Sequence, residues 1–295
     1  KKAVDFIQSH TVYCSIIMMN SNAANTISMF LDIICNNDEN FLQIKEGSSS
    51  LIDKIVEKLK LVDVNFLFNH CIVEVDNVTN EDVKLFTKNG EVFYGDTVIF
   101  AIPPKRYELL KGLDQGIKEL ISDSMILFET CKLVCIFDNP VFDHTNIPKL
   151  NFNVDNINCR EINYKYDEIN KCGIITLSCD QSTMHFWSSY IKNKNHTIPN
   201  DVTKYDMLET NLYVVLNQLF PDSESRILYY SLIDWSRKRG NTSGYYLLKP
   251  GYKQSTLFEK CNRMKNIYIT GSMWNINPFF IEGSLVYSEK IAELL

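Results

Sequence analysis

The spacing of apolar residues predicts helices in several parts of the chain. Apolar residues three or four positions apart, which line one side of a helix, follow residues 45–50 and recur over 205–220. The two apolar faces consist of Leu51, Ile52, Ile55, Val56 and Leu59 in the first helix and of Leu208, Leu212, Val215 and Leu219 in the second. Small and apolar residues without strand alternation predict helical structure over 1–40, and 117–122 reads as a short helix.

Runs of β-branched and aromatic residues predict strands between these helices. These runs cover residues 64–68, 71–75, 83–87, 92–94, 98–102, 128–137, 173–178, 185–189 and 266–270. Lys88, Asn89 and Gly90 separate two of them and are typical of a hairpin turn. Pro103 and Pro104 end another. Strands that alternate with helices in this way predict an α/β fold.

The last thirty residues join a strand, a glycine and a helix start. The strand over 266–270 is broken by Gly271 and Ser272, and an aromatic loop that ends at Phe280 follows. A turn then opens the final helix, and it consists of Ile281, Glu282, Gly283 and Ser284. A helix start leaves backbone N–H groups free and carries partial positive charge, so this arrangement favours an anionic or electron-rich ligand.

Residues 47–50, Gly-Ser-Ser-Ser, resemble a phosphate-binding loop or a nucleophilic serine site at first sight, and we reject both interpretations. They lack the lysine of a phosphate-binding loop, and they do not stand in the strand–GxSxG–helix context of a hydrolase nucleophile. We interpret them as a cap for the helix that follows.

Composition narrows the class of protein. The 295 residues suffice for one large domain or two medium ones, and the net charge of -6 without a basic block disfavours nucleic-acid binding. No apolar run is long enough to predict a membrane span. The nine cysteines are scattered singly, in an odd number, which argues against a disulfide framework and against a metal site. We therefore expect free thiols and a cytoplasmic or other reducing intracellular compartment.

Four ordered motifs resemble the flavin-containing amine oxidase family. They are the C-terminal strand–Gly–helix, the loop–helix–hairpin–strand run over 41–105, the strand lysine Lys132 followed by Pro140, and a tryptophan, Gly-aromatic and Pro-Gly series over 235–251. The family members expected from this resemblance are monoamine and polyamine oxidases. The Gly-rich dinucleotide loop GxGxxG is absent from the chain, so we expect a missing N-terminal segment or a partner chain to supply it.

The resemblance implies a two-domain α/β flavoprotein. A Rossmann-like FAD-binding domain, incomplete in this chain, would be interleaved with a mixed-sheet substrate domain. The implied division places 1–40 in a helical part of the substrate domain, 41–105 in the middle part of the FAD-binding domain, 106–265 in the substrate-binding domain and 266–295 in the C-terminal part of the FAD-binding domain.

The resemblance also assigns roles to individual residues. It implies that Lys132 is catalytic and holds a water molecule against the flavin N5 atom. It implies an aromatic substrate cage of Phe280 with Tyr245 or Tyr246. The residues implied to bind FAD are Ile72, Gly271, Ser272, Ile281, Glu282 and Gly283. The residues alone favour a different interpretation of Lys132, as a lysine on a solvated strand face between inward-facing Cys131 and Leu133.

The implied activity is FAD-dependent oxidation of a C–N bond in a small-molecule amine, with oxygen as the second substrate. The products would be an imine and hydrogen peroxide. One departure from the family pattern supports an alternative: Ser272 stands where the family has a glutamate. The alternative is a degenerate, flavin-free scaffold of amine oxidase type with a structural or interaction role. The resemblance favours the enzyme.

Overall fold

The computed structural model describes residues 21–24, 27, 44, 46–76, 82–138, 158–159, 161–167, 169–190, 206–220, 224–235, 245–275 and 281–295. The helices are α4 (Ser48–Lys60), α5 (Pro104–Tyr107), α6 (Gln115–Ser124), α7 (Gln181–Ser189), α8 (Asp206–Leu219), α9 (Gln254–Cys261), the 3-10 helix η2 (Ser272–Trp274) and α10 (Ile281–Leu294). The strands are β1 (Ile72–Asp76), β2 (Val83–Thr87), β3 (Val92–Gly95), β4 (Val98–Phe100), β5 (Met125–Phe128), β6 (Thr130–Asp138), β7 (Glu161–Asp167), β8 (Cys172–Asp180), β9 (Arg226–Asp234), β10 (Tyr245–Leu248) and β11 (Ile267–Ile269). The α/β fold class is confirmed.

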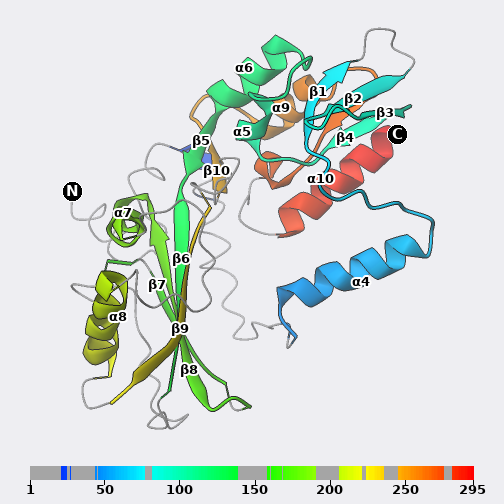
Figure 1. Ribbon diagram of the computed structural model, residues 1–295. Coiled ribbons are helices and arrows are strands. Elements are labelled where there is room, and N and C mark those ends of the chain that lie inside the picture. Colours follow the sequence, from blue (N-terminus) through cyan, green and yellow to red (C-terminus); the bar gives the residue numbers. More distant parts are fainter. Residues whose placement is uncertain are drawn as a thin grey trace.

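One group of elements surrounds a parallel strand pair. β4 and β11 are parallel, and the antiparallel sheet β1–β2–β3 lies beside them with α5, α6, α9 and α10 (Figure 1). Their buried side chains form a continuous core that includes Val75, Phe100, Tyr107, Ile269 and Trp274. This core also takes in α6 and α9, which lie within 106–265. The domain boundaries inferred from the sequence remain a prediction.

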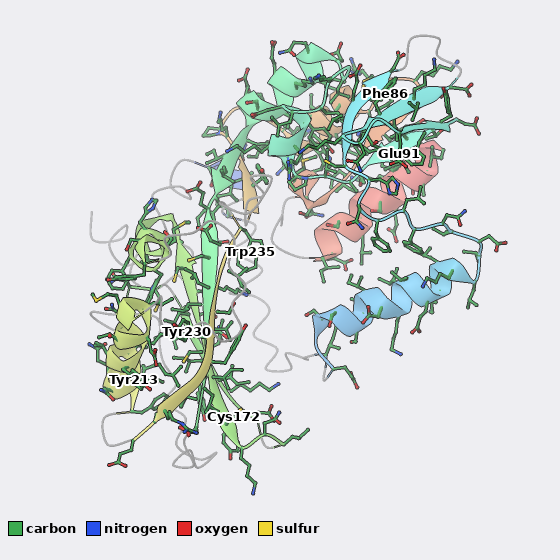
Figure 2. The ribbon with its side chains drawn as sticks, viewed as in Figure 1. Phe86, Glu91, Cys172, Tyr213, Tyr230 and Trp235 are labelled. Carbon is green, nitrogen blue, oxygen red and sulfur yellow. The ribbon has the colours of Figure 1, made fainter. Side chains whose placement is uncertain are left out.

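A second group is built on the antiparallel sheet β7–β8–β6–β9. Helices α7 and α8 cover one face of this sheet (Figure 1), and the stripe of Leu208, Leu212, Val215 and Leu219 predicted from the sequence is buried there. Figure 2 labels Tyr213 on α8 and Tyr230 on β9, and both are partly buried against this core. The Tyr213 hydroxyl accepts a hydrogen bond from the Ile227 N–H of β9 at 3.2 Å. The helix is therefore held to the sheet by polar as well as apolar contacts.

A two-stranded antiparallel ribbon joins the two groups. β5 pairs with β10 and leads, through Glu129, directly into β6. In Figure 1 this ribbon lies between the two groups. Strand β10 also contacts η2 in the first group. The first residues of β6, where Lys132 is found, therefore lie close to the junction of the two groups.

The structure corrects three local predictions. Residues 64–68 form no strand, and Leu67 and Phe68 are exposed. Residues 47–50 do not provide a serine cap, because the N-cap is Gly47, without a side-chain hydrogen bond, and the three serines form the first turn of α4. Residues 185–189 belong to helix α7 and not to a strand.

Helix α7 forms because of the residues that precede the predicted strand. The Thr183 N–H donates to Asp180 Oδ1 at 3.3 Å, and the Asp180 N–H donates to Thr183 Oγ1 at 3.1 Å, which satisfies backbone groups at the helix start. Residues two apart share a face of a strand but point roughly 200° apart on a helix. Trp187 is accordingly buried while His185 is exposed.

Candidate cofactor and catalytic site

The carboxyl ends of β4 and β11 form the edge at which ligands bind in parallel sheets. Their backbones pair in register from Ile267 and Val98 to Ile269 and Phe100. The Phe100 carbonyl, the last of β4, accepts hydrogen bonds from the Thr270 N–H and the Tyr107 hydroxyl, each at 3.0 Å. Burial raises the pKa of Tyr107 far above its ordinary value, so its hydroxyl stays protonated and donates. This edge is thus fixed by hydrogen bonds from both sides.

Gly271 follows β11 at this edge in a conformation that favours glycine. Its φ of 144° and ψ of 169° lie in a region that side chains other than glycine rarely adopt. Among the described residues, a Cβ atom built on Gly271 would meet no atom within 4 Å, so this part of the chain leaves the space in front of it open. Ser272 then begins η2 and is half-buried. The backbone at Gly271 can therefore be approached closely by a ligand.

Two polar side chains next to Gly271 were not identified from the sequence. The Thr270 hydroxyl and the Trp274 indole N–H are buried, and neither has a hydrogen-bond partner within the described part of the chain. An unsatisfied buried polar group costs about 1–3 kcal/mol, so such groups usually have a partner. Both are therefore candidates to bind a cofactor or an ordered water. Sequence reasoning missed them, because Thr270 reads as the end of a strand and Trp274 as part of the aromatic loop that follows.

Helix α10 presents its first turn next to this region. Gly283 is buried, while Ile281 and Glu282 are exposed. The buried side of α10 runs through Gly283, Tyr287 and Ile291. Tyr287 packs edge-on against Phe258, with ring centroids 4.9 Å apart, and Phe258 packs against Trp274 at 6.3 Å. This aromatic series holds α10 against η2.

Lys132 lies on the exposed face of β6. Its neighbours Cys131 and Leu133 are completely buried on the helix-covered face, as their alternation predicts. Across the sheet, Lys132 stands opposite Ser178 of β8 and Ile233 of β9. The ammonium group can therefore reach molecules on the open face of the sheet near the junction. Its catalytic role stays a prediction.

The aromatic cage residues are only partly described. Phe280 lies outside the described residues. Tyr245 pairs through its backbone with Phe128 in the β5–β10 ribbon. Tyr246 is half-buried against the first core, and its hydroxyl accepts a hydrogen bond from the Lys105 N–H at 3.2 Å. That contact fixes the Tyr246 ring at the start of α5, and its role as a cage residue stays a prediction.

Ile72 lies apart from the other predicted site residues along the sheet. It begins β1, pairs with Thr87 of β2 and packs partly buried against the first core. The pairing shifts between Ile72 and Glu74, which leaves Val73 free to accept a hydrogen bond from the Lys111 N–H at 3.0 Å. The role of Ile72 in binding FAD stays a prediction.

The structure is an α/β fold in which the parallel strands β4 and β11 end beside Gly271 in one group of elements, while Lys132 lies on the antiparallel sheet of the other group. The sequence model described as flavin containing amine oxidoreductase matches residues 13–286. The chain belongs to this family. No metal-binding group of three or more His, Cys, Asp or Glu residues occurs in the described part of the chain.

Solved structures of amine oxidases share the fold. Cyclohexylamine oxidase from Brevibacterium oxydans IH-35A superposes with a TM-score of 0.61 at 12% sequence identity, covering 84% of this chain and 52% of the other. A double mutant of putrescine oxidase, redesigned in its cofactor binding, gives a TM-score of 0.59 at 14% identity, with 84% and 53% covered. This chain thus spans about half the length of these proteins. No curated protein matches it.

Among the described residues, none of the helices combines the length and the apolar character that a membrane crossing requires.

Proposed function

We propose that this chain provides the substrate-binding part and a portion of the cofactor-binding part of an FAD-dependent amine oxidase. The reaction is oxidation of a C–N bond of a small-molecule amine by oxygen, giving an imine and hydrogen peroxide. The observation that carries the proposal is the open edge at Gly271, with the buried and unpartnered Thr270 hydroxyl and Trp274 indole beside it in the described part of the chain.

These residues fit a flavin. Gly271 allows close approach of a planar ring system, and the first turn of α10, in which Gly283 is buried, favours negative charge near it. Thr270 and Trp274 offer one hydroxyl and one N–H donor to polar atoms of the cofactor. Bound FAD supplies the two-electron acceptor that protein side chains lack. Ser272 replaces the glutamate of the family pattern and keeps a hydrogen-bonding group there without its charge.

Lys132 has the position expected of a residue that orients water on the substrate side. It stands on the exposed face of β6, in register with Ile233 and Ser178, and its ammonium carries three hydrogen-bond donors. A water held in this way can give or take a proton where the substrate nitrogen or oxygen reacts. Tyr246 and Phe280 are proposed to bound the same space with aromatic rings.

A further element must complete the cofactor site. In the described part of the chain the parallel sheet has two strands, β4 and β11, whereas parallel sheets are normally larger and covered on both faces. Helix α4 also has no buried residue, and Ile52 on its apolar side is 57% exposed. Together with the half-length coverage of the solved amine oxidases, this supports a dinucleotide-binding segment, outside the 295 residues, that packs on β11 and α4.

The test uses the polypeptide as it occurs, purified with every segment that is joined to these residues. A visible flavin band, and hydrogen peroxide formed on addition of cyclohexylamine or putrescine, are the expected results. A protein that stays colourless after incubation with added FAD contradicts the proposal and favours the flavin-free scaffold.

A matched pair of variants tests the lysine. Lys132→Met is expected to slow amine-dependent flavin bleaching, or its recovery in air, by about 10²-fold with the flavin still bound, as for removal of a proton-transfer group. Lys165→Met, which removes another exposed lysine of the same sheet, is expected to change neither rate. Equal rates in both variants would remove Lys132 from the site.

A further inference from the structure

Two cysteines face each other across the central strands of the substrate-side sheet. Cys131 of β6 and Cys179 of β8 are direct partners in the antiparallel register. Their side chains lie on the face that α7 and α8 cover, and they are 0% and 3% exposed. Both are free thiols. Directly opposed thiols in neighbouring strands form a site that the amine oxidase activity does not use.

The backbone spacing at such a pair is compatible with a disulfide. Directly opposed residues of antiparallel strands have Cα atoms about 4.5 or 5.5 Å apart, depending on the pair type. Disulfides span Cα separations of about 4.4–6.8 Å, with Cβ atoms about 3.5–4.5 Å apart. Opposed Cβ atoms lie about 4.5–5.5 Å apart, so closure requires the strands to approach by a fraction of an ångström to about 1 Å. The resulting bond is strained, and strain makes a disulfide easier to reduce.

The thiols already interact, and they lie below a short surface segment. A hydrogen bond with Cys131, together with burial, raises the pKa of Cys179 far above its ordinary value. The Cys179 sulfur also lies 3.7 Å from the carbonyl oxygen of Asn158, an exposed residue. Half-buried Cys159 is next to it, and burial raises its pKa to about 12. Asn158 and Cys159 are therefore the described residues that small oxidants would pass on the way to Cys179, and the scarcity of thiolate makes the reaction slow.

We propose that Cys131 and Cys179 form a reversible disulfide when the protein meets hydrogen peroxide. One thiol attacks the peroxide, which breaks the O–O bond, gives a sulfenic acid and releases one water. The second thiol then attacks that sulfur, forms the S–S bond and releases a second water. Two thiols are oxidised by two electrons, and one peroxide is reduced to two waters. Because Lys132 follows Cys131 directly, the new bond ties β6 to β8 next to the lysine.

The experiment is a mass measurement on the intact native polypeptide. It is treated with added hydrogen peroxide, alkylated after unfolding and digested without reduction. Trypsin places Cys131 on 119–132, Cys135 on 133–149, Cys159 on 150–160, and Cys172 with Cys179 on 172–192. A further cut after Leu177 separates Cys172 from Cys179. The expected product joins the fragment that contains Cys131 to the fragment that contains Cys179, has lost two hydrogens and returns to free thiols with dithiothreitol.

Cys135 provides the matched control. It lies on the same face of the same strand and is also 0% exposed, but its partners across the sheet are Ile175 and Tyr230. Cys135→Ala is expected to keep the cross-linked product, and Cys179→Ala to lose it. If the Cys179 variant does not fold, the cross-link map of the unsubstituted protein decides alone. A cross-link to Cys159, or peroxide treatment that leaves Cys131 fully alkylatable, overturns the proposal.

The outcome does not depend on the proposed amine oxidation, because the peroxide is added. If the protein shows no oxidase activity but still forms the Cys131–Cys179 bond, the disulfide proposal stands and the proposed amine oxidation is contradicted.

Discussion

Gly112 offers a stability test of the first core, because its backbone lies against β1. It has a φ of 75°, and a Cβ atom built on it would lie 1.7 Å from the Val75 carbonyl oxygen. The adjacent Lys111 holds β1 with two backbone hydrogen bonds, from its N–H to the Val73 carbonyl at 3.0 Å and from the Val75 N–H to its own carbonyl at 2.9 Å. Gly112→Ala must therefore separate the loop from β1.

The expected loss follows from these contacts. Real Cβ atoms essentially never approach a heavy atom closer than 3.0 Å, so the two backbones must move apart by roughly 1.3 Å. Such a shift breaks both hydrogen bonds of Lys111, each with a net contribution of about 1 kcal/mol. The left-handed conformation adds about 1–2 kcal/mol for alanine. We expect Gly112→Ala to lower the free energy of unfolding by about 3–4 kcal/mol.

Gly90 separates the cost of the close contact from the cost of the left-handed backbone conformation. Its φ is 87°, similar to that of Gly112, but a Cβ atom there would meet nothing within 4 Å. Gly90→Ala should thus lose only the conformational part, about 1–2 kcal/mol. Urea unfolding monitored by tryptophan fluorescence measures the free energy of unfolding of both variants, since Trp274 lies in the first core. If the two variants lose the same free energy of unfolding, the close approach of Gly112 to β1 does not contribute to stability and the reasoning is wrong.

Three further predictions address packing, pH and the cofactor edge. Gly173→Ala places a Cβ atom 2.5 Å from the buried ring of Phe137 and should lower the free energy of unfolding by about 1–3 kcal/mol. Adding Phe137→Leu to this variant should recover part of that loss, as measured by urea unfolding. Burial raises the pKa of Cys135 from its ordinary value near 9 to about 12. Because the thiol of the unfolded chain ionises first, the contribution of Cys135 to the free energy of unfolding is intact below pH 9. It falls between pH 9 and 12 by up to about 1.4 kcal/mol per pH unit. The unfolding midpoint of Cys135→Ala should accordingly fall less steeply over that window, and parallel curves would contradict the assignment. Gly283→Asp should abolish flavin retention in the purified polypeptide by crowding the buried start of α10, and full flavin absorbance in that variant would exclude the proposed edge.

The sequence alone determined the features that depend on local spacing. The amphipathic stripe of α8, the hairpin at Gly90 and the alternation of Cys131, Lys132 and Leu133 follow from helix and strand periods. The break at Gly271 could also be placed, because glycine after a strand marks an unusual backbone conformation. Family membership rested on the order of such motifs along the chain, and order is a property of sequence.

Tertiary structure decided the features that depend on which segments meet. The parallel pairing of β4 with β11, the approach of Gly112 to Val75 and the opposition of Cys131 and Cys179 join residues far apart in the chain, and no local period encodes strand register. The same holds for the buried Thr270 hydroxyl, because burial depends on neighbours from other segments. Local patterns fix the conformation of each element, whereas the packing of several elements fixes the site.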